Sequence, residues 1–241
     1  MLGDMDFLPS GDVIMKPISR LIGRFFLTLV FLFTFNGCQD EAVNNTHQIE
    51  GSGRLTTRVV DVSSFEGIVL AGIGEVFVTQ DSVQSVRVEA DDNVIDRLIL
   101  DVREGNLNIG IQKASYSHVT IRIRLSMRSV EFLEVAGAGS FASVGPLVCD
   151  SLTCRIVGAG SMTLSGRATA QLIELQGAGS IHGFNLECSR SRIILSGTGS
   201  AEVNVVQRLE ATITGIGSVV YAGNPPDVIS HVTGLGSIRR R

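Results

Sequence analysis

A pattern of Gly-x-Gly-Ser, written six times, limits what this chain can fold into more than any other feature of its sequence. The first glycines of successive copies lie 21, 19, 20, 18 and 19 residues apart. A period near 20 residues is typical of stacked structural units, in which each unit buries its apolar face against the next. We interpret the copies as structural turns, formed by Gly137, Gly139, Ser140, Gly158, Gly160, Ser161, Gly177, Gly179, Ser180, Gly197, Gly199, Ser200, Gly215, Gly217, Ser218, Gly234, Gly236 and Ser237.

Positions on either side of these glycines repeat their chemistry. The residues two positions before the first glycine and four positions after it are apolar in every copy, so both columns are expected to face a shared core. The position three residues before it is mostly polar and includes Glu134, Arg155 and Glu174. Adjacent coils of a β-solenoid lie about 4.8 Å apart, so these three side chains are expected to form an outward ladder of alternating charge. The apolar columns are Val135, Ile156, Leu175, Leu195, Ile213 and Val232, and Phe141, Met162, Ile181, Ala201, Val219 and Ile238.

A tight corner between strands explains why both glycine and serine recur in the Gly-x-Gly-Ser pattern. A tight bend needs backbone angles that are costly for residues with a Cβ atom, and glycine avoids this cost. The serine hydroxyl is expected to hydrogen-bond to corner backbone groups that no neighbouring strand satisfies. Together these patterns predict an all-β fold: a right-handed parallel β-helix, or β-solenoid, with repeats of about 18–21 residues and less regular N-terminal strands.

Strands are also predicted ahead of the clean repeats. Residues 86–90 and 119–125 alternate apolar and polar side chains, which places one face of each strand against a core. Glu104-Gly105-Asn106 supplies a turn that is expected to join residues 98–102 and 107–111 as a hairpin.

Gly72-Ile73-Gly74-Glu75 is interpreted as an earlier copy of the repeat, with a glutamate in the place of serine. The stretch from there to Gly137 has room for about three more coils. Within it, Asp91-Asp92-Asn93 is expected to start a short turn by capping. A calcium site is the alternative, although three adjacent residues fall short of the six to eight oxygens that calcium takes.

The first 37 residues have the layout of a secretory signal peptide. Basic residues up to position 24 precede an apolar run from residue 25 to 35. This run is about half of the roughly 20 residues that a membrane-spanning helix needs. Met15 opens a better-proportioned signal than Met1 and is an alternative start site.

Phe35-Asn36-Gly37-Cys38 resembles the lipobox of bacterial lipoproteins, in which the cysteine is lipidated and becomes the mature N-terminus. The small Gly37 fits this pattern, whereas Phe35 stands where leucine is usual. An ordinary signal peptide followed by an incidental cysteine is the alternative. We therefore predict a signal peptide over residues 1–37, a lipidated Cys38 with a flexible tether over residues 38–53, and a folded domain over residues 54–241.

The three remaining cysteines are predicted to fill the core. Cys149 and Cys188 both lie nine residues before a repeat glycine, in a column with Ala168 and Val206, and are therefore two coils apart. That separation exceeds the reach of a disulfide. Cys154 falls in a mostly apolar column, and a bridge from it to Cys149 across a corner is the alternative.

No catalytic, cofactor-binding or metal-binding residue is assigned from the sequence. His182 and Glu202 share a column in adjacent coils, which indicates a surface contact; a catalytic or metal pair is the alternative, but two ligands are too few for zinc. No nucleophile-elbow, phosphate-loop or HExxH pattern occurs. The formal net charge is −4 and no basic stretch is interleaved with aromatic residues, which argues against nucleic acid as a partner. Arg239-Arg240-Arg241 is interpreted as a solvated cap.

Over about residues 57–240 the sequence resembles the head GIN domain family of auto-transporter adhesins. The resemblance implies a β-helical domain of exported or lipid-anchored bacterial proteins with a proposed role in adhesion, and it brings no catalytic residues. The segments that carry it, besides the serial turns, are Phe65-Glu66-Gly67-Ile68, Gly72-Ile73-Gly74-Glu75-Val76, Glu89-Ala90-Asp91-Asp92-Asn93, Gly105-Asn106-Leu107 and Tyr221-Ala222-Gly223-Asn224-Pro225-Pro226.

Three functions follow as hypotheses. The first is a non-enzymatic lipoprotein of the cell envelope, held at the outer membrane or cell surface by its lipid, whose solenoid contacts a glycan or a surface protein. The second is a polysaccharide-active β-helix enzyme, which would need acidic or basic groups clustered over neighbouring coils. The third is a structural envelope component that forms homo-oligomers through the open ends of the solenoid, since unpaired strand edges are prone to pairing.

Overall fold

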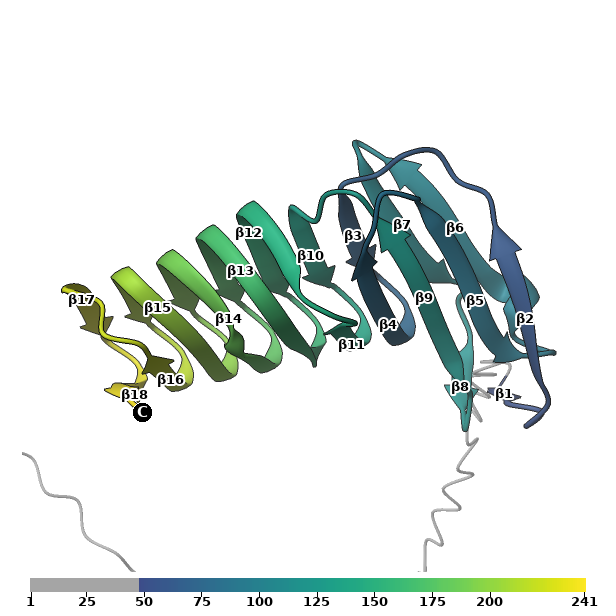
Figure 1. Ribbon diagram of the computed structural model, residues 1–241. Coiled ribbons are helices and arrows are strands. Elements are labelled where there is room, and N and C mark those ends of the chain that lie inside the picture. Colours follow the sequence, from purple (N-terminus) through teal and green to yellow (C-terminus); the bar gives the residue numbers. More distant parts are fainter. Residues whose placement is uncertain (1–47) are drawn as a thin grey trace, which may run out of the picture. The chain divides into compact units, whose positions relative to one another are not determined.

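The computed structural model describes residues 48–241, which fold into strands with one short 3-10 turn (Figure 1). In this part of the chain no helix is long and apolar enough to cross a membrane. The elements of the N-terminal half are β1 (Gln48–Glu50), β2 (Leu55–Val60), β3 (Gly67–Leu70), β4 (Ile73–Gln80), β5 (Ser85–Asp91), η1 (Ile95–Arg97), β6 (Leu98–Arg103), β7 (Asn106–Ile111), β8 (Ser115–Ser117) and β9 (Ile121–Met127).

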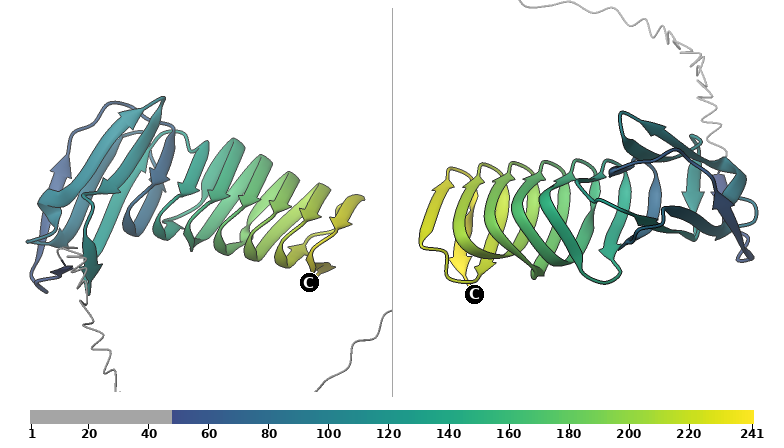
Figure 2. Two further views of the ribbon diagram at one scale, coloured as in Figure 1. Left: turned by 180° about the vertical axis from the view of Figure 1, so that it is seen from behind. Right: turned by 45° about the horizontal axis from the view of Figure 1, so that its top comes forward.

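The C-terminal half is a regular parallel β-solenoid, visible as a row of stacked coils in Figure 2. Each coil contributes one strand segment before the Gly-x-Gly corner and one after it, and each segment pairs with the same segment of the next coil. The strands are β10 (Phe132–Val135), β11 (Ala138–Ser143), β12 (Leu147–Ile156), β13 (Ala159–Leu175), β14 (Ala178–Leu195), β15 (Thr198–Ile213), β16 (Ile216–Ala222), β17 (Asp227–Val232) and β18 (Leu235–Arg240).

The six corners lie in register along one edge of this stack. Gly139 pairs with Gly160, Gly160 with Gly179, and the serines that follow them are aligned in the same way. The predicted inward columns form the core, and their side chains are buried in every coil but the last. There, Val232 is 42% exposed, because in the described residues no further coil covers it.

The corner glycines are required by the closeness of the coils more than by the bend. A Cβ atom on Gly158 would lie 2.0 Å from the carbonyl oxygen of Gly137 in the preceding coil, and one on Gly160 would lie 2.0 Å from the oxygen of Gly139. Neither glycine has a positive φ. Two later corners differ, since Gly199 and Gly217 have φ of +155° and +156°. The prediction that unusual backbone angles select glycine is therefore wrong for Gly158 and Gly160, where steric exclusion by the neighbouring backbone is sufficient, and it is confirmed at Gly199 and Gly217.

The corner serines also differ from their prediction. The corner backbone donors are already satisfied by the preceding coil, since Gly158 N donates to Val135 O at 3.0 Å and Ala159 N to Gly137 O at 2.9 Å. These corner N–H groups therefore need no serine hydroxyl as an acceptor. In the described residues, the side-chain hydrogen bond between corner serines runs along the column instead, from Ser200 Oγ to Ser180 Oγ at 3.2 Å.

The earlier copy of the repeat is confirmed as a coil. Its strands β3 and β4 stack directly on β10 and β11, with Leu70 paired to Val135 and Glu75 to Ser140. The prediction of about three further coils between this copy and Gly137 is wrong. One further coil, made by β7 and β9, stacks on the opposite side of β3 and β4.

Of the remaining strands of the N-terminal half, β2, β5 and β6 pair antiparallel and lie at that end of the stack (Figure 1), whereas β1 and β8 form a separate parallel pair. Strand β5 pairs with β9 and with β2, and the predicted hairpin is confirmed as β6 and β7. The physical reason is the lack of corners: between residues 84 and 127 the only glycines are Gly105 and Gly110, and no Gly-x-Gly occurs. Without that corner β5 and β6 pair antiparallel with β9 and β7, while β7 and β9 still stack in parallel on the next coil through the longer connection of residues 112–120.

We predict that Gly158→Ala lowers the free energy of unfolding by about 1–3 kcal/mol or more, because the added methyl group must push two coils apart. Chemical denaturation followed by circular dichroism measures the change. Gly110→Ala is the matched control, since a Cβ atom there would meet nothing closer than Ile99 at 3.9 Å. Equal stability losses in both variants would contradict the steric explanation.

Candidate binding surface

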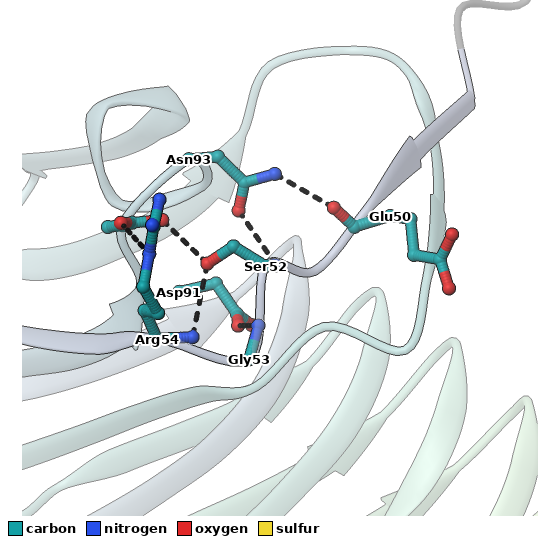
Figure 3. A network of polar contacts seen from close by, with 7 residues as sticks. Glu50, Ser52, Gly53, Arg54, Asp91 and Asn93 are labelled. Carbon is teal, nitrogen blue, oxygen red and sulfur yellow. Dashed lines mark hydrogen bonds and ion pairs between the residues drawn. The ribbon is translucent and has the colours of Figure 1, made fainter.

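The first described residues are fastened to the turn at Asp91-Asp92-Asn93 (Figure 3). The carboxylate of Asp91, 1% exposed, accepts hydrogen bonds from two backbone groups: Gly53 N at 2.8 Å and Thr120 N at 2.7 Å. These bonds join an N-terminal segment to the loop that precedes β9. We call residues 50–54 together with residues 91–93 the N-terminal clip.

Exposed bonds complete the N-terminal clip. Ser52 Oγ donates to Asp92 Oδ1 at 2.6 Å, and Arg54 Nε donates to Asp92 Oδ2 at 2.9 Å. The hydrogen bond from Ser52 is the main cause that lowers the pKa of Asp92. Asn93 Nδ2 donates to the backbone oxygen of Glu50 at 2.8 Å.

This arrangement decides between the two interpretations of the acidic turn. The four carboxylate oxygens of Asp91 and Asp92 all accept hydrogen bonds from protein donors, so they are not arranged as a calcium shell. Residues 48–53, which the sequence assigns to the tether, are part of the fold: β1 pairs with β8, and Ser52 and Gly53 belong to the clip. Short polar side chains that bond to distant backbone explain why a segment with a flexible composition is ordered here.

The charge ladder lies on the outward face of β10, β12 and β13, as predicted. Arg155 Nη1 lies 3.2 Å from Glu134 Oε2, and Arg155 Nε lies 2.6 Å from Glu174 Oε2. The guanidinium also stands 5.3 Å from the ring centre of Phe132. Arg155 thus pairs with both glutamates and leaves the ladder with a net charge of −1, and this arrangement suits a role in holding neighbouring coils in register.

His182 and Glu202 are in contact on the outward face of β14 and β15. The distance between His182 Nδ1 and Glu202 Oε2 is 3.1 Å, and the imidazole is half-exposed. In the described part of the chain, no group of three or more histidine, cysteine, aspartate or glutamate side chains is placed to hold a metal ion.

The thiols occupy the interior of the solenoid. Cys149, Cys154 and Cys188 are buried and free, so the alternative of a bridge between the first two is wrong. Burial raises the pKa of the Cys149 thiol to about 11 and those of the other two to about 12, which leaves little reactive thiolate near neutral pH. The column of Cys188 continues at Val205 rather than at the predicted Val206, because β15 has one residue more than β14 between this column and the corner.

Of the hollows in the described surface, none of which is predicted from the sequence, two are lined largely by polar side chains. The larger, about 590 Å³, lies where the chain leaves the antiparallel half, and it is lined by Ser64, Phe65, Glu66, Gln84, Gly105, Arg128 and Ser129. The other, about 340 Å³, lies on β14 and β15 and is lined by Arg190, Ser191, Arg192, Arg208 and Glu210; we call it the arginine hollow.

A signal for the arginine hollow was present in the sequence. Arg190 and Arg208 are 18 residues apart, which is one period of the repeat, and Arg192 lies two positions from Arg190 on the same face of its strand. Alignment on the glycine corners alone did not bring out this group. Cys38 and the signal peptide lie outside the described residues.

We predict that Asp91→Asn lowers the free energy of unfolding by about 1–3 kcal/mol, because an amide nitrogen would then face one of two buried backbone donors. Thermal and urea unfolding measure this change. Asp61→Asn, at an exposed position of the same half, serves as the control and is expected to change stability little. Equal stability of the Asp91 variant and the unmodified protein would show that the N-terminal clip does not stabilise the fold.

This architecture is similar to that of known proteins. A family model described as "putative auto-transporter adhesin, head GIN domain" matches residues 64–225. No curated protein matches the chain.

Among solved structures, a putative adhesin from Bacteroides fragilis is 21% identical, with a TM-score of 0.66 over 80% of this chain and 100% of that one. Putative adhesins from Parabacteroides distasonis and Parabacteroides merdae are 20% and 19% identical, with TM-scores of 0.47 and 0.48. Both matches cover 80% of this chain, and they cover 100% of the Parabacteroides distasonis chain and 99% of the Parabacteroides merdae chain. The Bacteroides likeness shows a shared fold, and the family model goes further: this chain belongs to the auto-transporter adhesin head GIN domain family.

Proposed function

We propose that this protein is an exported, lipid-anchored component of the cell envelope whose β-solenoid binds a surface glycan or protein without catalysing a reaction. The observation that carries the proposal is the contrast between the two sides of the solenoid wall. Inward columns hold apolar side chains in coil after coil. The outward column that follows the corner serines changes its chemistry at each step: Ala142, Thr163, His182, Glu202, Val220 and Arg239.

The contrast has a simple physical meaning. Burying a leucine or isoleucine side chain contributes roughly 1.5–3 kcal/mol, so among the side chains the inward columns contribute most to the stability of the stack. Outward residues contribute little to that stability and are free to differ, which is what a surface that recognises one partner requires. Membership of a family described as adhesins supports the same proposal.

The acid-base groups on this surface are few and mostly neutralised by each other. In the charge ladder both glutamates are paired with Arg155, and the only histidine that contacts a carboxylate in the solenoid half is His182. Such pairs do not converge on one point from several coils, as the carboxylates of a glycosidase do. The proposal of a non-catalytic role rests on this dispersion.

The anchor part of the proposal rests on the lipobox-like Phe35-Asn36-Gly37-Cys38. We expect radiolabelled palmitate to be incorporated into the protein expressed in a bacterial host, and the label to be lost in Cys38→Ala. Cys149→Ala is the matched control and should keep the label, because its thiol is buried in the domain. Labelling that persists without Cys38 would contradict lipidation at this residue.

The binding part is tested by a glycan array probed with the full-length protein in detergent. We expect binding to a restricted subset of glycans, because the outward columns present a different set of groups at each coil. A flat array, combined with concentration-dependent sedimentation of the protein, would favour the structural alternative instead. That alternative has one observation behind it: near the outer edges of β17 and β18, Leu235 is 75% exposed.

A further inference from the structure

The arginine hollow gathers positive charge on an otherwise acidic chain. Arg190 and Arg192 both point outward from β14, and Arg208 on β15 is the register partner of Arg190. The formal net charge of the whole chain is −4. Three guanidinium groups around one hollow therefore stand out against the rest of the surface.

The charges of this hollow are only partly neutralised. Arg192 Nε lies 3.6 Å from Glu210 Oε1, and Arg208 Nη1 lies 2.8 Å from Asp227 Oδ2. Within the described residues, Arg190 has no carboxylate within the 4.0 Å of an ion pair. It is stacked beside Arg208, and like charges in directly opposed positions of neighbouring strands destabilise a sheet. An anion seated between the two arginines would remove this cost.

The hollow also lies where the repeat is irregular. Between Cys188 and Arg190 the ladder of β14 and β15 shifts, since β15 inserts one residue more than β14 before the next pair, Arg190 and Arg208. Bulges of this kind are rare in parallel sheets, and they are over-represented beside functional sites, where they re-aim a side chain. The shift adjoins the one stacked pair of arginines in the described solenoid.

We propose that the arginine hollow binds an acidic group, a carboxylate or a sulfate, of a polysaccharide. The inference rests on the proposed binding function and names the ligand class for it. A guanidinium presents a planar set of donors that matches both oxygens of a carboxylate or sulfate, so Arg190 and Arg208 can each offer a two-bond contact. The hollow is shallow and open, at about 340 Å³, so it offers contacts to one acidic sugar unit rather than an enclosed site for a long segment.

The same features favour a polysaccharide over a nucleic acid. Surfaces that hold single-stranded nucleic acid combine a basic groove with aromatic side chains on which bases stack. No aromatic residue lines the hollow, and the basic groups are confined to two neighbouring coils.

The test measures the affinity of the full-length protein in detergent for two acidic polymers, polygalacturonate for carboxylate and heparin fragments for sulfate. We expect saturable binding to at least one of them, weakened about tenfold or more by the double substitution Arg190→Gln and Arg208→Gln. The control removes the same charge elsewhere: Lys113→Gln with Arg167→Gln, two exposed basic residues outside the hollow. Thermal unfolding of both variants checks that the fold is kept.

Three results would overturn the inference. They are no binding to either acidic polymer, equal losses in the two double variants, or equally tight and equally Arg190-dependent binding of single-stranded DNA. If the array shows binding to neutral glycans while both acidic polymers fail, the inference falls and the proposed function stands. If acidic polymers bind and the hollow variant alone loses affinity, the carboxylate and sulfate arms identify which group is recognised.

Discussion

The backbone ladder that runs from coil to coil through each Gly-x-Gly corner is the interaction on which this structure depends. Hydrogen bonds such as Gly158 N to Val135 O continue across the bend, so the strands on both sides of the corner keep the same spacing. That closeness leaves no room for a Cβ atom, which is why glycine occupies the corner in each of the six Gly-x-Gly-Ser coils. Because the ladder fixes the register, residues at equal distance from a corner stack, and each column acquires one environment.

The register between coils brings side chains that are about 20 residues apart in sequence into contact on the surface. Arg155 meets two glutamates only because the ladder brings three consecutive coils into line, and their side chains are largely shielded, at 17% and 19% exposure for the glutamates. Surface ion pairs contribute about 0–1 kcal/mol each, less than one buried leucine. The charge ladder of Glu134, Arg155 and Glu174 thus contributes more to the choice of register than to stability. Other outward columns are free to carry groups that bind a partner.

The repeat made the solenoid half predictable, because six aligned corners determine which residues face inward. The N-terminal half was not predictable to the same degree. The alternating pattern of residues 86–90 indicates a strand but does not say which strand it pairs with, and its partners β9 and β2 lie on either side through long-range contacts. The Val205 offset has a similar origin: counting from a corner cannot detect one extra residue inserted within the strand. The N-terminal clip depends on side chains that are unremarkable until the fold brings residues 52 and 92 together.

An ideal repeat presents the same surface at every coil and therefore has no means of holding a ligand at one place. A solenoid that recognises something must break its own regularity, either in side chains or in register. Here the register between β13 and β14 shifts once and that between β14 and β15 shifts twice, and the second of those two shifts precedes the stacked pair Arg190 and Arg208. The extra residue costs nothing at the corners, where pairing resumes before Leu195 and Ile213. A local register shift between two coils thus places one distinct site on a repetitive surface, while the backbone hydrogen bonds on either side and the core beneath it stay continuous.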